Sequence, residues 1–562
     1  MGRDGADGGP LRLAIVGLGP KGLFALERVL DHAHRTGAPA RIDVDVFEPH
    51  PAPGAGPVYD PAQPAYLRMN FAADRLDMWW PQTQAVPAGE RLSFVAWRRC
   101  DAGGVRAGED PYPPRAEVGR YLAAGLAGLL RHAPPAVCVT LRPVAVEALD
   151  RRAGGWRVRA GGGATHDYDE VLVTVGHGLA VDPLGTGRPE HAVAHVGAVF
   201  PVGRRLSAQR VPAGAAVAVR GFALTFLDAA LALTEGRGGT FDAGEHPYRL
   251  RYRPAEAEAG VILPYSRTGR PMLAKPDPRL AAGIPALDAI TQEGSARIVA
   301  LPGGFSLQAD LRGILAATAA ASLFAAGGGP ARRASAVAAA WLAAACDGAP
   351  PPSGQSPAAE LERSVAIGAG RRTPDLAWAL GHTWRSVYPA LVRRVGARGL
   401  SDRQWPAFRR LAAQLERVSF GPPLVNAAKL LALVDAGRVD LTHVAAGQIT
   451  STGAVTSLRS ARGARAVDVV VNAVLASPGA GAGLPAQLRA SGYARTLPGR
   501  RGLDVGADAA AADGLAIIGR ATEDSVIGND TLSRAMHPHA DRWAAGVVER
   551  AARRTSCAIG AS

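Results

Sequence analysis

Residues 11–22 read LRLAIVGLGPKG, an apolar run that passes directly into a glycine-rich turn. The run at 11–16 is typical of a buried parallel strand. After the turn, LFALERVLDHAHR repeats leucine at helical spacing, and a second apolar run, IDVDVF at 42–47, ends at Glu48. Strand, glycine turn, helix, strand and acidic residue follow in the order of a dinucleotide-binding domain, so the sequence predicts one here.

The glycines of this turn have separate expected tasks. Gly17 makes the tight turn, Gly19 lets the main chain approach a pyrophosphate, and Gly22 allows close packing of the helix on the strand. The helix N-terminus then presents its free N–H groups to the phosphates. Glu48 is placed to hydrogen-bond the hydroxyls of the adenosine ribose. The remaining loop residues assigned to cofactor binding are Pro20 and Lys21. The alternative is a glycine turn that binds no ligand.

Two later segments favour FAD as this dinucleotide. DYDEVLVTVGHG at 167–178 predicts a strand that ends in a glycine turn at Gly176, where the chain leaves one nucleotide domain for the next. DGLAIIGRATEDSVIGNDTLSR at 513–534 predicts a late strand, a glycine loop and a helix. In flavoproteins with two dinucleotide domains, such a helix points its N-terminus at the flavin. The candidates there are Gly519, Asp530 and Thr531. His177 is left open between a packing role and a place beside the flavin.

A second, degraded glycine turn lies in AAVAVRGFALTFLDAALAL at 215–233. Gly221 is present, but Ala223 and Phe226 stand at the second and third glycine positions, which puts efficient use of NADPH in doubt. We assign Gly221 and Thr225 to this site. VILPYSRTGRP at 261–271 adds a strand and a turn in which Ser266 and Arg267 would take an adenosine 2′-phosphate. That favours NADPH over NADH, whereas the alternative is an arginine turn exposed to solvent.

These segments predict an α/β fold with two dinucleotide-binding (Rossmann-type) domains and a mainly helical insertion. The expected boundaries are a first part of the FAD-binding domain at 1–190, an NAD(P)H-binding domain at 191–300, a helical insertion and substrate region at 301–440, and a second part of the FAD-binding domain at 441–562. The strand in VDVVVNAVLASPG at 467–479 is expected to rejoin the first sheet.

Composition excludes several classes of function. The net charge is +14, but the basic residues are spread along the chain without a long run, which argues against nucleic-acid binding. We find no apolar stretch of bilayer length and no signal peptide at the N-terminus, so we expect a cytoplasmic protein that does not span a membrane. The four cysteines form no CxxC pair, which argues against a redox dithiol and a zinc site.

Three further segments carry a family resemblance. MNFAADRLDMWWP at 69–81, LSFVAWRRC at 92–100 and YPPRAEVGRYL at 112–122 follow the flavin turn in the order found in N-hydroxylating flavin monooxygenases. More closely, the chain resembles the actinobacterial FAD/NAD(P)-binding flavoproteins that include the nitrosuccinate-forming aspartate N-monooxygenases. Arg115, from the Arg-x-Glu of the third segment, is a further cofactor-binding candidate.

The resemblance implies an activity and its cofactors. NADPH would reduce FAD, oxygen would add at flavin C4a, and the resulting C4a-hydroperoxyflavin would transfer one oxygen atom to the amine of a small amino acid, with L-aspartate as the named candidate. Met69 and Asn70 would line the flavin ring, and Asn70 would be the hydrogen-bonding catalytic group. Trp79 and Trp80 are left open between covering the ring and packing in the core.

Three arginines are candidates to bind the substrate carboxylate: Arg68, Arg385 and Arg495. Each has the alternative of a solvated or structural charge. The three lysines of the chain, Lys21, Lys275 and Lys429, each lie beside a motif. The expected partners are the amino-acid substrate and oxygen, and a homo-oligomer is left open.

Three rival functions remain at this point. The same scaffold would serve a flavin oxidase or a monooxygenase that oxidises carbon or sulfur. A flavin-binding partner protein without turnover is the third, and its support is the degraded second turn.

Overall fold

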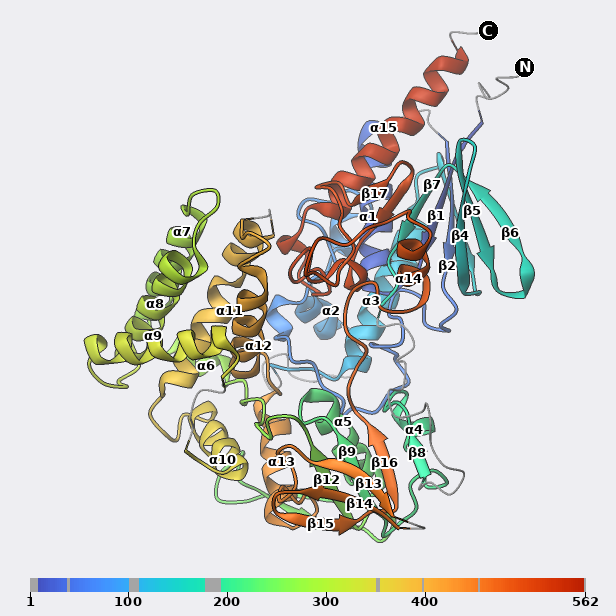
Figure 1. Cartoon of the computed structure of the whole chain (residues 1–562). Coiled ribbons are helices and arrows are strands. Elements are labelled where there is room, and N and C mark those ends of the chain that lie inside the picture. Colours follow the sequence, from blue (N-terminus) through green and yellow to red (C-terminus); the bar gives the residue numbers. More distant parts are fainter. Residues whose placement is uncertain are drawn as a thin grey trace. The chain divides into compact units, whose positions relative to one another are not determined.

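The glycine turn at 17–22 lies at the carboxyl end of a parallel strand in a computed structural model, which describes residues 9–37, 41–100, 111–176, 194–349, 354–396, 399–452 and 455–559 (Figure 1). The chain divides into two compact units. The first comprises 1–62, 71–179 and 476–562, and the second comprises 63–70 and 180–475. Neither unit is one continuous stretch of sequence.

The first unit is built on a six-stranded sheet in the order β17-β18-β7-β1-β2-β3. All neighbouring strands are parallel except β17, which pairs antiparallel with β18 at one edge. Two helices, α3 and α15, pack against α1. The bounds are β1 Leu11–Val16, α1 Pro20–Thr36, β2 Ile42–Phe47, α3 Arg115–Arg131, β3 Val137–Arg142, β7 Glu170–Val173, β17 Ala510–Ala512, β18 Leu515–Ile517 and α15 His539–Ile559.

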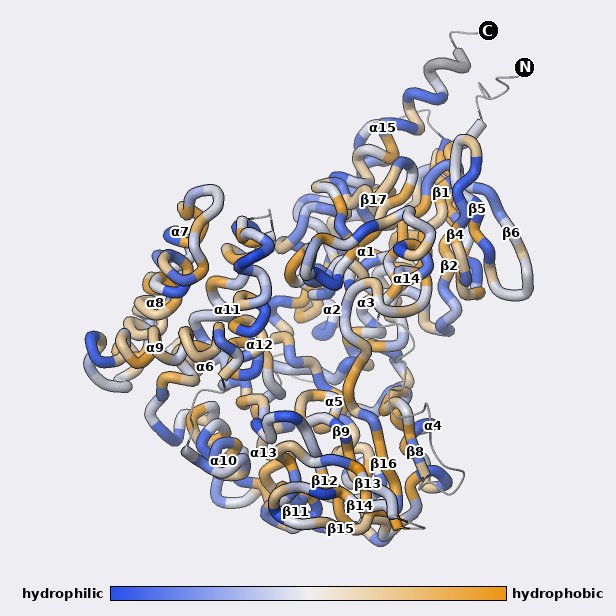
Figure 2. The backbone as a smooth tube through the Cα atoms, viewed as in Figure 1, coloured by the Kyte–Doolittle hydropathy of each residue, from blue (hydrophilic) through white to orange (hydrophobic). Residues whose placement is uncertain are grey.

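Burial explains why this first sheet forms. Residues 13–16 of β1 are almost fully buried, as expected for a central parallel strand covered on both faces. Pro20 is at the start of α1, where its missing N–H costs nothing, and Gly37 ends the helix in a left-handed conformation. Figure 2 colours much of β1 hydrophobic.

A three-stranded antiparallel sheet, β4-β5-β6, and two short helices complete the longer elements of the first unit. The side chain of Trp156 in β5 is buried in the same core as β1 and β7. The bounds are α2 Phe94–Cys100, β4 Val146–Arg152, β5 Gly155–Ala160, β6 Thr165–Tyr168 and α14 Gly483–Ala490.

The second unit contains a four-stranded parallel sheet in the order β12-β9-β16-β8. The bounds are β8 Ala194–Val196, β9 Ala216–Arg220, β12 Val261–Tyr265 and β16 Val469–Asn472. The prediction that 467–479 rejoins the first sheet is therefore wrong. Residues 469–471 pair with Val217–Val219 on one side and with Ala194–Val196 on the other. A short run of valines identifies a buried strand but does not identify its neighbours.

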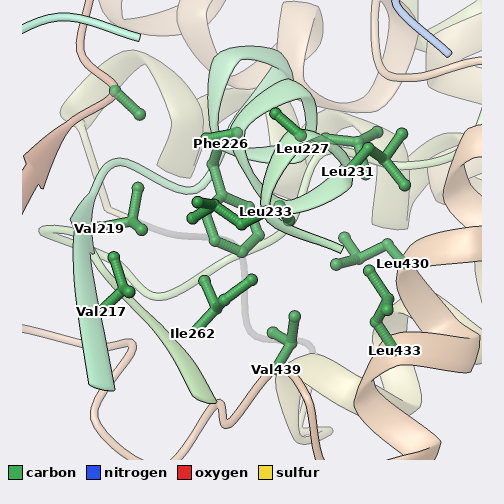
Figure 3. Packing of buried hydrophobic residues seen from close by; sticks show 14 of the residues in the cluster. Val217, Val219, Phe226, Leu227, Leu231, Leu233, Ile262, Leu430, Leu433 and Val439 are labelled. Atoms are coloured by element: carbon green, nitrogen blue, oxygen red, sulfur yellow. The ribbon is translucent and has the colours of Figure 1, made fainter. Parts of the chain in front are cut away.

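The core of this sheet is packed by helix α5 (Leu224–Leu233) and helix α13 (Leu424–Asp435). Figure 3 shows Phe226 and Leu231 of α5 with Val217, Ile262 and Leu433 of the surrounding elements. These side chains belong to one buried cluster, in which Phe226 is 1% exposed. The strand–turn–helix unit at 216–233 therefore exists despite its degraded glycine pattern.

Helices fill the chain between β12 and the following antiparallel sheet β13-β14-β15, as the predicted helical insertion requires. The helices are α6 Pro278–Ala282, α7 Ala286–Val299, α8 Arg312–Ala325, α9 Ala331–Asp347, α10 Pro357–Gly368, α11 Leu376–Val395, α12 Trp405–Ser419 and α13. The remaining α-helix is α4 Val202–Arg205, and the remaining strands are β10 Thr240–Ala243, β11 Leu250–Arg253, β13 Gln448–Thr452, β14 Val455–Ser460 and β15 Gly463–Ala466.

The topology confirms the predicted fold class. The first sheet is parallel except at its β17 edge and the second is parallel throughout, and each carries a strand–glycine–helix turn. The expected boundary at 441 differs from the division of the structure, in which residues 441–475 lie in the second unit. The assignment of the units to FAD and NAD(P)H stays a prediction. In the described ranges no helix is both long and apolar enough to cross a membrane.

Candidate functional site

The glycine turn of the first unit has the geometry that close approach of a ligand requires. Gly17 has a φ of +97°, a region that favours glycine, and its N–H donates to the carbonyl oxygen of Phe47 at 2.8 Å. A Cβ atom on Gly22 would lie 2.1 Å from the carbonyl oxygen of Gly17, so only glycine fits there. A Cβ on Gly19 would meet nothing within 4 Å, which leaves this main chain open to a ligand.

Glu48 fastens the turn to the end of β2. One carboxylate oxygen accepts a hydrogen bond from the N–H of Leu18 at 2.7 Å, and the other accepts one from the N–H of His50 at 2.9 Å. Each oxygen keeps a second acceptor position. The structure thus gives Glu48 a role that the sequence did not predict, and its contact with a ribose stays a prediction.

Two further predicted cofactor residues, Gly519 and Asp530, come together around Lys21. A Cβ on Gly519, which has a φ of +93°, would lie 3.3 Å from Cγ of Lys21. Burial lowers the pKa of the Lys21 ammonium to about 8, against the opposing effect of Asp530. Asp530 also forms an ion pair with Arg520 at 3.0 Å. The loop at 519–530 and the glycine turn therefore form one site.

The helix expected within 513–534 is absent from the structure. Gly519 is followed by a short 3-10 turn, Arg520–Thr522, and the next long helix is α15, which begins at His539. Thr531 lies in this irregular stretch, where its hydroxyl accepts a hydrogen bond from the N–H of Ser533 at 3.2 Å. Side-chain contacts hold residues 519–534 in this irregular conformation. A search for helical periodicity in the sequence cannot detect such contacts.

Two histidines, His537 and His539, also belong to this site. Burial and the nearby Lys21 ammonium lower the pKa of His537 to about 3, and burial, Arg542 and Lys21 lower that of His539 to about 4. Within the described ranges, Nδ1 of His539 has no hydrogen-bond partner. The open Gly19, the buried Lys21 ammonium and this ring nitrogen fit a bound dinucleotide with phosphate and ring acceptors. Their one sequence signal was their place just after the predicted flavin loop.

Trp80 has a structural role in this unit. Its ring lies 5.5 Å from the guanidinium group of Arg28 and 5.6 Å from that of Arg534. Arg534 also pairs with Glu27 at 2.5 Å and lies 4.4 Å from the ring of Phe24. Trp79 is buried, and its indole N–H donates to the carbonyl oxygen of Leu92. For both tryptophans the packing alternative is the one that these contacts favour.

Arg115 and Gly176 also belong to the first unit. Arg115 begins α3 and lies near Tyr59, whose pKa burial raises to about 12 against the effect of Arg115. Asp530 acts on the same phenol in the opposite direction. Gly176 is exposed just after β7, and a Cβ there would meet nothing within 4 Å. His177 lies outside the described residues.

The second glycine turn keeps its first glycine. Gly221 has a φ of +114°, and its N–H donates to the carbonyl oxygen of Tyr265 at 2.8 Å. Ala223 stands at the N-cap of α5, Thr225 is buried in its first turn, and Phe226 extends into the core. Phe226 therefore fills the hydrophobic core of the second unit and does not block the glycine turn.

Ser266 and Arg267 follow β12, the strand next to β9. The hydroxyl oxygen of Ser266 accepts a hydrogen bond from the N–H of Gly269 at 3.0 Å, which closes the turn. Arg267 is exposed. This position, after the second strand of a dinucleotide fold, is compatible with a 2′-phosphate site.

Asn70 and Arg385 meet at neighbouring carbonyl groups in the second unit. The amide of Asn70 donates to the carbonyl oxygen of Phe420 at 3.1 Å, and Nη1 of Arg385 donates to that of Ser419 at 3.0 Å. The Lys275 ammonium donates to the carbonyl oxygen of Asn70 and lies 5.7 Å from the ring of Phe420. The structure thus brings a predicted catalytic residue and a predicted substrate residue together.

The other predicted residues have simpler surroundings. Met69 is buried and Arg68 is partly buried, both in the second unit. Arg495 belongs to the first unit, where it is 80% exposed and pairs with Asp504 at 3.5 Å, so the solvated alternative is favoured for it. Lys429 pairs with Glu235 at 2.6 Å. Among the described residues, no group of three or more histidine, cysteine or acidic side chains could hold a metal ion.

The comparisons with known proteins agree with this geometry. The sequence model of a family described as FAD-NAD(P)-binding matches residues 14–178, which include the glycine turn, Glu48 and β7. This match supports the expectation of FAD and a nicotinamide cofactor.

A nitrosuccinic acid synthase of Aspergillus oryzae is 31% identical over 275 residues, which cover 47% of this chain and 41% of that protein. An L-aspartate N-monooxygenase (nitrosuccinate-forming) of Streptomyces cremeus is 32% identical over 293 residues, covering 47% of this chain and 43% of the relative. The resemblance to the aspartate N-monooxygenases is confirmed. The matched region spans less than half the length of these curated relatives.

Among solved structures, L-lysine 6-monooxygenase of Pseudomonas syringae aligns with a TM-score of 0.49 and 14% sequence identity, covering 97% of this chain and 100% of that chain.

Proposed function

We propose that this chain is an FAD- and NADPH-dependent monooxygenase that N-hydroxylates the amine of a small amino acid, with L-aspartate as substrate and nitrosuccinate as product. The observation that carries the proposal is the identity of about a third, over nearly half of the chain, to proteins with that activity. Two strand–glycine–helix turns, one in each unit, support the need for two dinucleotides.

The first unit would bind FAD. The turn at 17–22 and the N-terminus of α1 would hold the pyrophosphate through main-chain N–H groups, and the Lys21 ammonium would add a positive charge. Glu48 would keep the turn against β2 and accept hydrogen bonds from the ribose. FAD supplies the oxygen chemistry when bound.

The second unit would bind NADPH and the substrate. The turn at Gly221 would face the nicotinamide dinucleotide, and Ser266 and Arg267 would take its 2′-phosphate. Asn70, held by Phe420 and Lys275, would donate or accept a hydrogen bond at the reacting centre, and Arg385 would bind a substrate carboxylate.

The first oxygenation would consume one NADPH, one proton and one O₂ for each amine. NADPH provides two electrons, one atom of O₂ forms the N–O bond, and the other leaves as water. Repeated oxidation of the same nitrogen would lead to nitrosuccinate. The residues of the chain would bind both dinucleotides, keep water away and hold the amine in position.

The test follows NADPH absorbance and product mass with purified protein, FAD, oxygen and L-aspartate. Aspartate-dependent NADPH loss together with a nitroso or nitro dicarboxylate supports the proposal. NADPH loss without any change in aspartate refutes the substrate. Bound FAD that NADPH does not reduce refutes the activity and favours the oxidase or the partner protein.

A further inference from the structure

A small pocket lies in the second unit, against α10, α11 and the segment at 273–276. Its polar lining consists of Arg363, Ser364, Asp375, Trp378 and Arg385, and its apolar walls include Ile367 and Val418. The pocket is partly open, and its volume of about 20 Å³ is enough for a water-sized group. Only the head group of a ligand would therefore enter it while the rest stayed outside.

Two donors at this pocket are unused. Trp378 is 7% exposed, and its indole Nε1 has no hydrogen-bond partner within the ranges that the structure describes. Nε of Arg363 is likewise buried and unpartnered within these ranges. An indole and a guanidinium can only donate, and a buried donor without an acceptor costs free energy. A ligand that carries acceptor atoms at this pocket would relieve that cost.

Arginine side chains cluster beside Arg363, which lines the pocket. Glu360, which is 3% exposed, pairs with Arg270 at 3.3 Å and with Arg417 at 3.2 Å, and Asp375 pairs with Arg363. These three guanidinium groups share two carboxylates, and Arg385 adds a fourth at the pocket itself. Burial, and then the neighbouring Arg270, lower the pKa of Arg417. A bound anion would relieve this repulsion.

We propose that this pocket binds one carboxylate group of a small acidic ligand, through Nε of Arg363, Nε1 of Trp378 and the guanidinium of Arg385. Planar donors suit a carboxylate, and the small enclosed space suits one such group better than a tetrahedral phosphate. The identity of the ligand as an acidic amino acid rests on the proposed function. The existence of the anion site does not depend on that function.

The site has a link to the predicted catalytic residue within the same unit. Arg385 donates to the carbonyl of Ser419, and Asn70 donates to the carbonyl of the next residue, Phe420. The two side chains therefore bind carbonyl groups of adjacent residues, and a carboxylate bound by Arg385 would lie on the same part of the chain as Asn70. This relationship favours a substrate carboxylate over an unrelated anion.

The test measures binding of succinate to the full FAD-loaded chain by titration calorimetry. Succinate carries two carboxylates and no amine, so its binding does not depend on turnover. Wild-type protein is expected to bind it. Trp378→Phe removes one N–H and should weaken binding about threefold to tenfold, and Arg363→Gln should weaken it roughly tenfold to a hundredfold.

A variant that is expected to bind succinate more tightly is also needed, because misfolding would weaken binding and could not strengthen it. Asp375→Asn removes a competing negative charge and leaves a residue that still caps α11, so it should bind succinate severalfold more tightly. Arg333→Gln, an exposed arginine of α9, is the matched control and should bind like wild type. No succinate binding by wild type, or equal binding by Arg363→Gln, Trp378→Phe and Arg333→Gln, overturns the proposal. Tighter binding of inorganic phosphate than of succinate overturns it as well.

Turnover kinetics separate the two sources of the carboxylate. Succinate that raises the KM for aspartate supports the pocket as part of the substrate site, and succinate that binds without changing that KM supports it as a separate carboxylate site. If succinate binds as expected while aspartate is not oxidised, the pocket stands and the proposed function fails. If aspartate is oxidised and the pocket variants bind succinate normally, the reverse holds.

Discussion

The carbonyl oxygen of Asn70 accepts a hydrogen bond from the buried ammonium of Lys275, and the Asn70 side chain donates to Phe420 at 3.1 Å. The residue that the family resemblance places at the flavin is thus held through both its main chain and its side chain. The contacts bridge 205 and 350 positions of sequence. Lys275, one of three lysines in an arginine-rich chain, has a defined structural partner.

Lys275→Met is expected to release the Asn70 main chain and to uncouple NADPH oxidation from product formation. The yield of product per NADPH should fall by about tenfold or more, since misplacement of a reacting group by roughly 1 Å can cost on the order of a hundredfold. Hydrogen peroxide should rise correspondingly in a peroxidase-coupled assay. Lys429→Met, which breaks the pair with Glu235, is the control. Equal coupling in the two variants would refute the role of Lys275.

FAD affinity is expected to depend on pH through Lys21. Burial lowers the pKa of its ammonium to about 8 in the protein without FAD, and a bound pyrophosphate would raise it again. Binding then favours the protonated lysine, so affinity should be constant below pH 8 and fall as the pH rises above it. Fluorescence titration of FAD between pH 7 and pH 10 measures this. Lys21→Arg, whose guanidinium stays charged, should remove the dependence, and a flat wild-type profile would argue against it.

Gly19→Ala and Gly22→Ala form a matched pair. The added methyl meets nothing within 4 Å at Gly19 but lies 2.1 Å from the Gly17 carbonyl oxygen at Gly22. Gly22→Ala should therefore destabilise the protein by about 1–3 kcal/mol. Gly19→Ala should leave the melting temperature without FAD nearly unchanged yet weaken FAD binding at least about tenfold, because the main chain must approach the pyrophosphate. An equal loss of stability in both variants would contradict the open space beside Gly19.

Phe226 stands where a third glycine would be, and the packing predicts that it cannot be replaced by a small residue. Phe226→Ala should cost about 3–5 kcal/mol, because it leaves a cavity between α5 and the strands β9 and β12. The drop in melting temperature, followed by circular dichroism, measures this. Thr225→Ser, a smaller change in the same helical turn, should cost far less. A mild effect of Phe226→Ala would mean that the core can close around the gap.

Arg267→Ala should discriminate between the two nicotinamide cofactors. Loss of the guanidinium that would bind the 2′-phosphate is expected to raise the KM for NADPH about tenfold to a hundredfold and to leave that for NADH unchanged. Arg253→Ala, an exposed arginine paired with Asp242, provides the control. Parallel changes for both cofactors would place the 2′-phosphate elsewhere.

Local patterns in the sequence were enough for the strands, turns and helices around both glycine motifs. The apolar run, the glycines and the leucine spacing at 11–30 act over a few residues, and the same holds for 216–233. The partners of β16 could not be predicted, because a run of valines fits any central strand. The irregular segment after Gly519 escaped prediction because ion pairs and hydrogen bonds such as Arg520–Asp530 maintain it, not periodicity.

The carboxylate pocket could not be found from sequence for a related reason. Nothing in the local sequence distinguishes Arg363, Trp378 or Arg385 from the other residues of their helices. The tertiary fold brings them to one cavity. Arg385 and Arg495 were both predicted to bind the substrate carboxylate because of their charge alone. Only their surroundings in the structure distinguish the two. Burial and unused donors are properties of the folded chain.

The interleaving of the two units has a consequence for synthesis of the protein. Strand β18 pairs with β7 but follows it by more than 300 residues, among them residues 180–475 of the second unit. At roughly 5–20 residues per second, a ribosome would expose the unpaired edge of β7 for something like 15 seconds to more than a minute. The second unit has all its own residues by position 475 and is free to fold first, so the unit that begins the chain is the last to be completed.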